Sequence, residues 1–111
     1  MFSKENKTLK NVKTMNDIEF LIKKEVIQSY YAIPLFINGK QISDNMIYLP
    51  HGFGQKKYMV DNKISNMIKC GEAEKYDIQV YYKKKSLIPC LLVISALKEN
   101  EIVYSETINI W

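Results

Sequence analysis

With 111 residues, 47% of them hydrophobic and 25% charged, the chain is long enough for one domain with a real core and too short for two. Its formal net charge is +4 at pH 7, and all 16 basic residues are lysines. The absence of arginine excludes bidentate recognition of guanine edges and of buried carboxylates. An anionic partner is therefore expected to be bound by point charges, through its backbone or its shape, although a bias in coding composition explains part of the lysine excess equally well.

Neither a membrane span nor a signal peptide is expected. The longest uncharged run, residues 26–39, is 14 residues long, whereas a helix needs about 20 apolar residues to cross a bilayer. The first ten residues contain lysines but lack the apolar core of a signal peptide. The expectation is a soluble protein of the cytoplasm that does not bind a membrane.

The N-terminal part is predicted to be an arm followed by a helix. Residues 1–13 are polar and lysine-rich without an apolar period, so they are assigned to a flexible basic arm ahead of a single α+β domain at 14–111. Thr14 and Asp17 have the spacing of a helix start. The apolar residues that follow predict a helix of about 12 residues with one buried face: Ile18, Leu21, Ile22, Val26 and Ile27.

A hairpin is predicted next. Asn38 and Gly39 lie between two apolar runs, which is the preferred sequence of a two-residue type I′ turn. Strands are therefore expected at about 33–37 and 40–48. Pro34 lacks an N–H group, so the first strand should lie at an edge or begin there.

The stretch 49–58, LPHGFGQKKY, holds the only histidine and two of the four glycines. It is interpreted as a turn between two strands, the second being a short strand at 56–60. Asp61 is then predicted to cap a helix over 62–69 that Gly71 ends.

Alternation of apolar and polar residues dominates the second half. It predicts a strand from Lys75 to Tyr82, a turn at 83–86, a central strand within 87–97, a turn at 98–101 and a last strand from Ile102. Together these make a three-stranded antiparallel meander. The predicted fold is α+β: a small mixed, mostly antiparallel sheet or partly closed barrel, of PUA-like, OB-like or SH3-like shape, with one or two short helices.

No catalytic or metal-binding set is recognisable. Cys90 is expected to be buried in a central strand and Cys70 to end a helix, and no spacing brings either thiol to His51. Gly52 and Gly54 could let a backbone approach phosphate, but the pattern matches no nucleotide-binding glycine motif, and a turn explains it better. No cofactor or metal is expected, and the protein is predicted not to be an enzyme.

The lysines are the better candidates for function. Within the arm they recur at every third residue and could follow a polyanion, although a solubilising tail explains them as well. A second group is expected at a hairpin tip beside Tyr81 and Tyr82. Alternation places Tyr82 on the core face of the strand and Tyr81 on the outer face, so the Tyr81 ring could stack on a base, although a charged tip that only prevents aggregation fits equally. A third pair follows the glycine loop. The candidate nucleic-acid-binding residues are Lys83, Lys84, Lys85, Tyr81, Lys56, Lys57, Lys4, Lys7, Lys10 and Lys13.

Two functions are therefore predicted. The first is a small non-enzymatic regulatory module that binds nucleic acid, RNA or a single strand rather than duplex DNA. The alternative is a protein–protein interaction module, such as an inhibitor, immunity or adaptor protein, that uses a strand edge or a tyrosine patch to bind a single protein partner. Tyr30, Tyr31 and Trp111 could serve either the core or an interface.

Overall fold

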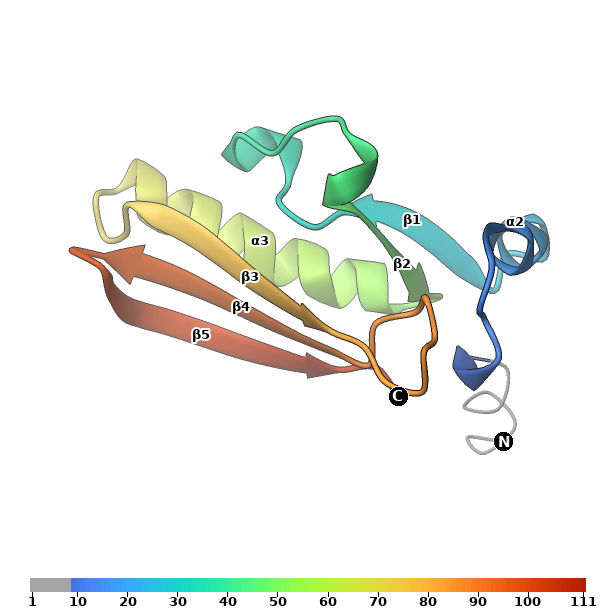
Figure 1. Ribbon diagram of the computed structural model, residues 1–111. Coiled ribbons are helices and arrows are strands. Elements are labelled where there is room, and N and C mark those ends of the chain that lie inside the picture. The colour runs from blue at the N-terminus through green and yellow to red at the C-terminus, as the bar shows by residue number, and fades with distance from the viewer. Residues whose placement is uncertain (1–8) are drawn as a thin grey trace.

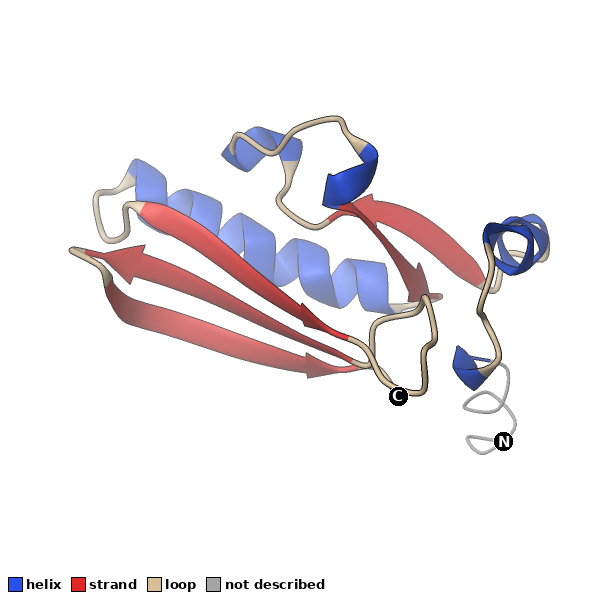
Figure 2. Ribbon diagram, viewed as in Figure 1, coloured by secondary structure: helices blue, strands red, loops and turns tan. Residues whose placement is uncertain are grey.

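The computed structural model describes residues 9–111 and shows a small α+β fold with two antiparallel sheets (Figures 1 and 2). β1 (Ile27–Tyr31) pairs with β2 (Met46–Pro50), and β3 (Lys75–Tyr81), β4 (Leu91–Lys98) and β5 (Glu101–Asn109) form a sheet in that order. Helix α2 (Met15–Lys23) precedes the first sheet, and helix α3 (Phe53–Lys69) connects the two. The predicted fold class is confirmed, and the described strands do not close into a barrel.

The core lies between α3 and the three-stranded sheet. Ile64 of α3 and Leu92, Ile94 and Ala96 of β4 are fully buried, and Ile88 is buried beside them. Complete burial of one such aliphatic side chain stabilises the fold by about 1.5–3 kcal/mol. Figure 1 shows α3 running across one face of this sheet, so the core fixes the helix over the central strand.

The meander was predicted correctly. The inward residues of β3 alternate with exposed ones, and its register with β4 runs from Lys75 opposite Leu97 to Tyr81 opposite Leu91. Glu99 and Asn100 form the turn between β4 and β5, both with positive φ. The connection between β3 and β4 is longer than predicted, because β4 begins only at Leu91.

Helix α2 begins where the sequence indicated but ends early. The Thr14 hydroxyl accepts from the Asp17 N–H, and the Asp17 carboxylate accepts from the Thr14 N–H, which makes a capping box. The predicted length of 12 residues is wrong, because α2 ends at Lys23. Glu25 has a φ of 59°, which turns the chain into β1, so Ile27 is buried on a strand.

The hairpin predicted around Asn38 and Gly39 is wrong. Residues 32–45 form a long connection between β1 and β2, with short 3₁₀ turns at Leu35–Ile37 and Ser43–Asn45. Asn38 does have positive φ, 67°, but there it ends the first 3₁₀ turn. The Gly39 N–H donates to the Pro34 carbonyl over 2.9 Å, and a Cβ at Gly39 would clash with the Ile33 carbonyl oxygen. Glycine is therefore needed at this position so that the loop backbone can approach the Ile33 carbonyl closely.

The strand predicted at 56–60 and the helix start at Asp61 are also wrong. The glycine stretch turns the chain from β2 into α3: Gly52, with a φ of 95°, immediately precedes the helix. Lys57 and Asp61 occupy core-facing positions of this helix. Because these residues are charged, the sequence does not show the apolar period of a helix there. The predicted stop is confirmed, since Gly71 has a φ of 79° and donates to the Ile68 carbonyl over 3.2 Å.

The arm predicted at 1–13 needs a correction within the described residues. Leu9 and Val12 are buried in the core, so residues 9–13 belong to the folded domain, while residues 1–8 lie outside the described part of the chain. The sequence showed only two apolar residues here, too few to reveal a period. None of the helices in residues 9–111 combines the length and the apolarity needed to cross a membrane.

Candidate functional site

Two lysine-rich segments that are far apart in the sequence meet at one end of the molecule. The Ser86 hydroxyl donates to the Leu9 carbonyl over 2.5 Å, and the Leu87 N–H donates to the Val12 carbonyl over 2.8 Å. The Lys13 ammonium donates to the carbonyl of Lys84. Figure 1 shows the loop before β4 beside the first described residues of the chain. We call this surface the basic end and define it by Lys10, Lys13, Lys83, Lys84 and Lys85, all of which are exposed.

The charges of the basic end are not neutralised by carboxylates in the described chain. The ion pair found within residues 9–111 joins Lys57 to Asp61, which is not part of this surface. Asp17 follows Lys13 closely, but its carboxylate accepts the N–H groups of Lys13 and Thr14, over 2.9 and 3.1 Å. These two bonds lower the pKa of Asp17. Within residues 9–111, the ammonium groups of the basic end therefore have no carboxylate as an ion-pair partner.

Aromatic rings border the basic end. Tyr81 is 44% exposed and donates its hydroxyl to the Gln79 side chain over 2.5 Å. Tyr82 is 50% exposed; its predicted place on the core face is wrong because β3 ends at Tyr81. Trp111 is half-buried, donates its indole N–H to the Ile88 carbonyl over 3.1 Å, and has the Lys83 ammonium 4.8 Å from its ring centroid. No pattern in the sequence could connect Trp111 with Lys83.

The remaining predicted lysines do not join this surface as a group. Lys56 is exposed on α3, with its ammonium 5.1 Å from the centroid of the Phe53 ring. Lys57 is only 2% exposed, so we remove it from the candidate interface. Adjacent positions on a helix point about 100° apart, which separates the two side chains. Lys4 and Lys7 lie outside the described residues.

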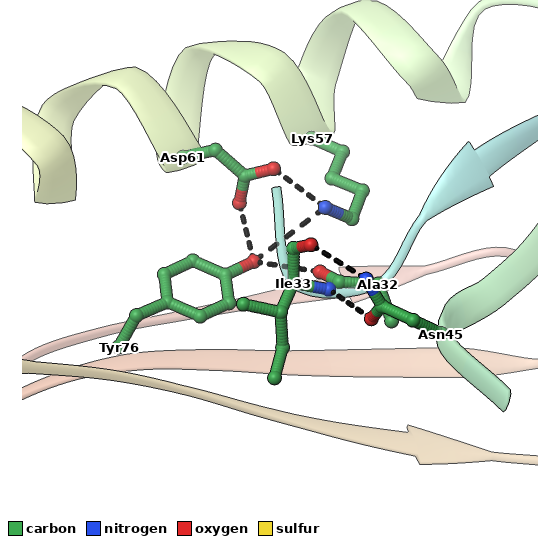
Figure 3. A network of polar contacts seen from close by, with 6 residues as sticks. All are labelled: Ala32, Ile33, Asn45, Lys57, Asp61 and Tyr76. Carbon is green, nitrogen blue, oxygen red and sulfur yellow. Dashed lines mark hydrogen bonds and ion pairs between the residues drawn. The ribbon is translucent and has the colours of Figure 1, made fainter. Parts of the chain in front are cut away.

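Lys57 instead belongs to a buried polar network (Figure 3). Its ammonium lies 2.5 Å from Asp61 Oδ2, and the Tyr76 hydroxyl donates to Asp61 Oδ1 over 2.5 Å. The Ala32 carbonyl oxygen lies 3.2 Å from the same hydroxyl. Burial lowers the pKa of Lys57 and raises that of Asp61. Burial and the Asp61 carboxylate raise the pKa of Tyr76, which keeps its hydroxyl protonated.

The same network holds the long loop in place. The Asn45 side chain accepts the Ile33 N–H and donates to the Ile33 carbonyl, each over 2.8 Å (Figure 3). It also donates to the Lys40 carbonyl over 3.0 Å. Tyr76 links this loop to α3 and β3. The polar groups satisfy one another, so the arrangement acts as an internal anchor. The spacing of four residues between Lys57 and Asp61 was its one signal in the sequence.

The histidine and the cysteines are placed separately. His51 is exposed just after β2, and its backbone N–H donates to the Val26 carbonyl over 3.0 Å. Cys70 is a free, exposed thiol. Cys90 is free and half-buried, and it precedes β4 instead of lying inside that strand as predicted. Across residues 9–111, no three His, Cys, Asp or Glu side chains gather closely enough to share a metal ion.

Comparison of the chain with protein-family models, with curated proteins and with solved structures gave no match. The functional assignment accordingly depends on the geometry and charge of the surfaces described above.

Proposed function

We propose that the protein is a small, non-enzymatic module that binds nucleic acid, RNA or another single strand, at the basic end and regulates its target by occupying it. The observation that carries the proposal is the docking of residues 9–13 on the loop that holds Lys83, Lys84 and Lys85. This contact adds Lys10 and Lys13 to the second lysine group and concentrates positive charge on one surface.

Phosphate contacts account for the affinity. Each ammonium that neutralises a phosphate releases condensed counterions, and for single strands the slope of log K against log salt is about −0.7 per contact. Five contacts would give a slope of about −3.5. Lysine recognises phosphate as a point charge, so binding should depend steeply on salt and only weakly on base sequence.

The aromatic residues favour a single strand over a duplex. Tyr81 and Tyr82 expose their rings beside the lysines. Bases of a single strand can stack on such rings, while those of a duplex are already stacked on one another. A surface that combines ammonium groups with exposed rings therefore fits RNA loops or single strands.

A charge-matched pair of variants tests the proposal. Lys83, Lys84 and Lys85 are replaced by alanine in one variant; Lys69, Lys75 and Lys98, exposed at the opposite end of the three-stranded sheet, are replaced in the other. Fluorescence anisotropy with a labelled single-stranded RNA is measured over a series of salt concentrations. The first variant should flatten the salt slope by about 2, and the second should change it much less.

The outcomes separate a local site from a general charge effect. Equal losses in the two variants would show that only the net charge matters and would remove the basic end from the account. A wild-type protein that retains no RNA at low salt would end the proposal altogether.

The protein-interaction alternative has its own supporting observation. Phe36 and Tyr58 are exposed, their ring centroids lie 6.4 Å apart, and they border a pocket of about 280 Å³ over Lys57 and Asp61. Apolar pockets with aromatic walls suit an anchoring side chain of a partner. This function predicts recovery of one nucleic-acid-free protein partner in a pull-down, with little salt dependence, and loss of that partner in Phe36→Ala.

A further inference from the structure

The outer edge of β5 is open. In the order β3-β4-β5 it pairs only with β4, and in Figure 1 nothing in the described chain lies along its other side. The strand spans Glu101–Asn109 without a proline or a lysine, the residues that commonly protect edge strands from pairing. One bulge, at Val103, interrupts its register with β4. The remaining backbone groups of this edge are thus available to another strand.

A groove runs beside this edge. Between α3 and β5 lies an open hollow of about 680 Å³, which continues into another of about 560 Å³; Met59 and Tyr104 line both. Met59 is 64% exposed, and Tyr58 and Val103, which line the larger hollow with it, are exposed as well. Because α3 lies over β4, the sheet extends beyond the helix at β5. Contiguous exposed apolar surface of this kind is typical of an interface.

The two walls of the groove carry opposite charges. Lys56 and Lys63 lie on α3, and Lys63 places its ammonium 4.1 Å from the centroid of the Tyr104 ring. Glu106 lies on β5, on the same face of the strand as Tyr104. Under a two-fold rotation, a surface with one basic and one acidic wall becomes complementary to itself.

We infer that β5 and this groove form the interface with a second copy of the chain. The two β5 strands pair antiparallel about a two-fold axis near Ser105, which joins two three-stranded sheets into one of six strands. About this axis, each residue lies opposite the residue that is equally far from Ser105 in the other direction along the second copy. Glu106 of the second copy therefore lies opposite Tyr104, within reach of Lys63. Hydrogen bonds supply the pairing, and the lysine–glutamate contacts select the orientation.

The spacing of the layers agrees with this arrangement. Strands lie about 4.8 Å apart, so the two β4 strands would be separated by about 14 Å. The two α3 helices above them would be similarly spaced, somewhat wider than the 8–10 Å of closely packed helices. Large side chains are needed to fill the difference, and Tyr58, Met59 and Tyr104 are the ones present there.

Analytical ultracentrifugation of the full chain, freed of nucleic acid by a high-salt wash, tests the inference. The wild type should sediment as a species of twice 13.0 kDa. Val103→Glu and Met59→Glu each place a carboxylate in the interface of both copies and should weaken the dimer by at least about tenfold. Gln41→Glu adds the same charge on the exposed loop between β1 and β2 and should leave the dimer unchanged.

The result is decisive in either direction. A wild type that remains monomeric at every concentration overturns the inference, and so does a dimer that both interface variants leave intact. Capture of a different protein by this face of a monomeric wild type would also overturn it. Circular dichroism checks that the variants, both at exposed positions, keep the fold. The readout involves no nucleic acid, so the proposed function can fail without affecting this test.

Discussion

Lys57 shows how much one buried charge can depend on its partner. Its ammonium is 2.5 Å from Asp61, and both side chains are almost wholly buried. Removal of one member of such a pair leaves an uncompensated charge in the core, which typically costs about 3–5 kcal/mol. We expect Lys57→Met to lower the free energy of unfolding by this amount in urea titrations. The double variant Lys57→Met with Asp61→Leu should be clearly more stable than the single one, and a single variant as stable as the wild type would contradict the role of the pair.

Tyr81 and Tyr82 make a second residue-level prediction, which depends on the proposed function. If their rings stack on bases, Tyr81→Leu and Tyr82→Leu should each cost about 1–3 kcal/mol of RNA affinity. The salt slope should not change, because no phosphate contact is lost. Tyr58→Leu, at an exposed ring on α3, is the matched control. Anisotropy titrations in which all three variants lose equal affinity would rule out stacking at this site.

For single residues, the sequence predicted the side of an element on which a side chain lies better than it predicted whether that side chain is exposed or buried. Alternation along β3 correctly placed Tyr81 on the outer face, because each residue of a strand reverses the side. Lys56 is exposed and the adjacent Lys57 is buried because both lie on α3. The start of that helix was not predicted, since charged residues occupy some of its core-facing positions. Lys83 follows β3 and Trp111 follows β5, so their contact joins residues that are far apart in the sequence, and no local pattern predicts it.

Glycines mark two different constraints at the level of elements. Gly39 has no room for a Cβ because of the Ile33 carbonyl, whereas Gly71 has open space but a φ of 79°. Gly39→Ala and Gly39→Asn should both cost about 1–3 kcal/mol of stability through overpacking. Gly71→Ala should cost about 1–2 kcal/mol, and Gly71→Asn less, because asparagine tolerates the left-handed region. Thermal unfolding of the four variants checks this; rescue by asparagine at Gly39 would contradict the steric explanation.

The start of α2 gives a prediction with a pH dependence. Thr14→Ala should cost about 1 kcal/mol, the usual effect of losing an N-cap hydroxyl. The pKa of Asp17 is lowered from 3.8 in the folded state, so its contribution is present above that value and is lost as the pH falls through the lowered pKa. The difference in unfolding free energy between the wild type and Asp17→Asn should therefore shrink below pH 3.8. A difference that stays constant there would exclude the carboxylate as its source.

Elements whose information is local were the predictable ones. The strands of the meander and the capping box can be read from neighbouring residues, and they were correct. The first hairpin was not predictable in this way, because β1 and β2 are separated by a long loop that the Asn45 and Tyr76 hydrogen bonds hold. The asparagine–glycine pair carried a true signal for positive φ but was interpreted as the wrong kind of turn.

For the whole molecule, the basic end and the inferred dimer lead to a joint prediction. Antiparallel pairing near Ser105 places the two basic ends on opposite sides of the axis. The four residues from Ser105 to the end of β5 span about 13 Å, so the two basic ends lie at least about 26 Å apart. An oligonucleotide that is too short to reach both should bind each copy independently. A longer one should gain affinity by about tenfold or more through effective concentration.

The gain in affinity with RNA length allows the basic end and the inferred β5 interface to be tested separately. Val103→Glu should abolish the dependence on RNA length while leaving the affinity for the short oligonucleotide close to that of Gln41→Glu, which carries the same added charge. The reason is that Val103 lies near the β4–β5 turn, at the end of the sheet away from the loop before β4. Anisotropy titrations with a series of RNA lengths give the readout. If the length dependence persists in Val103→Glu, a single chain contacts the whole strand, and the two basic ends do not act together.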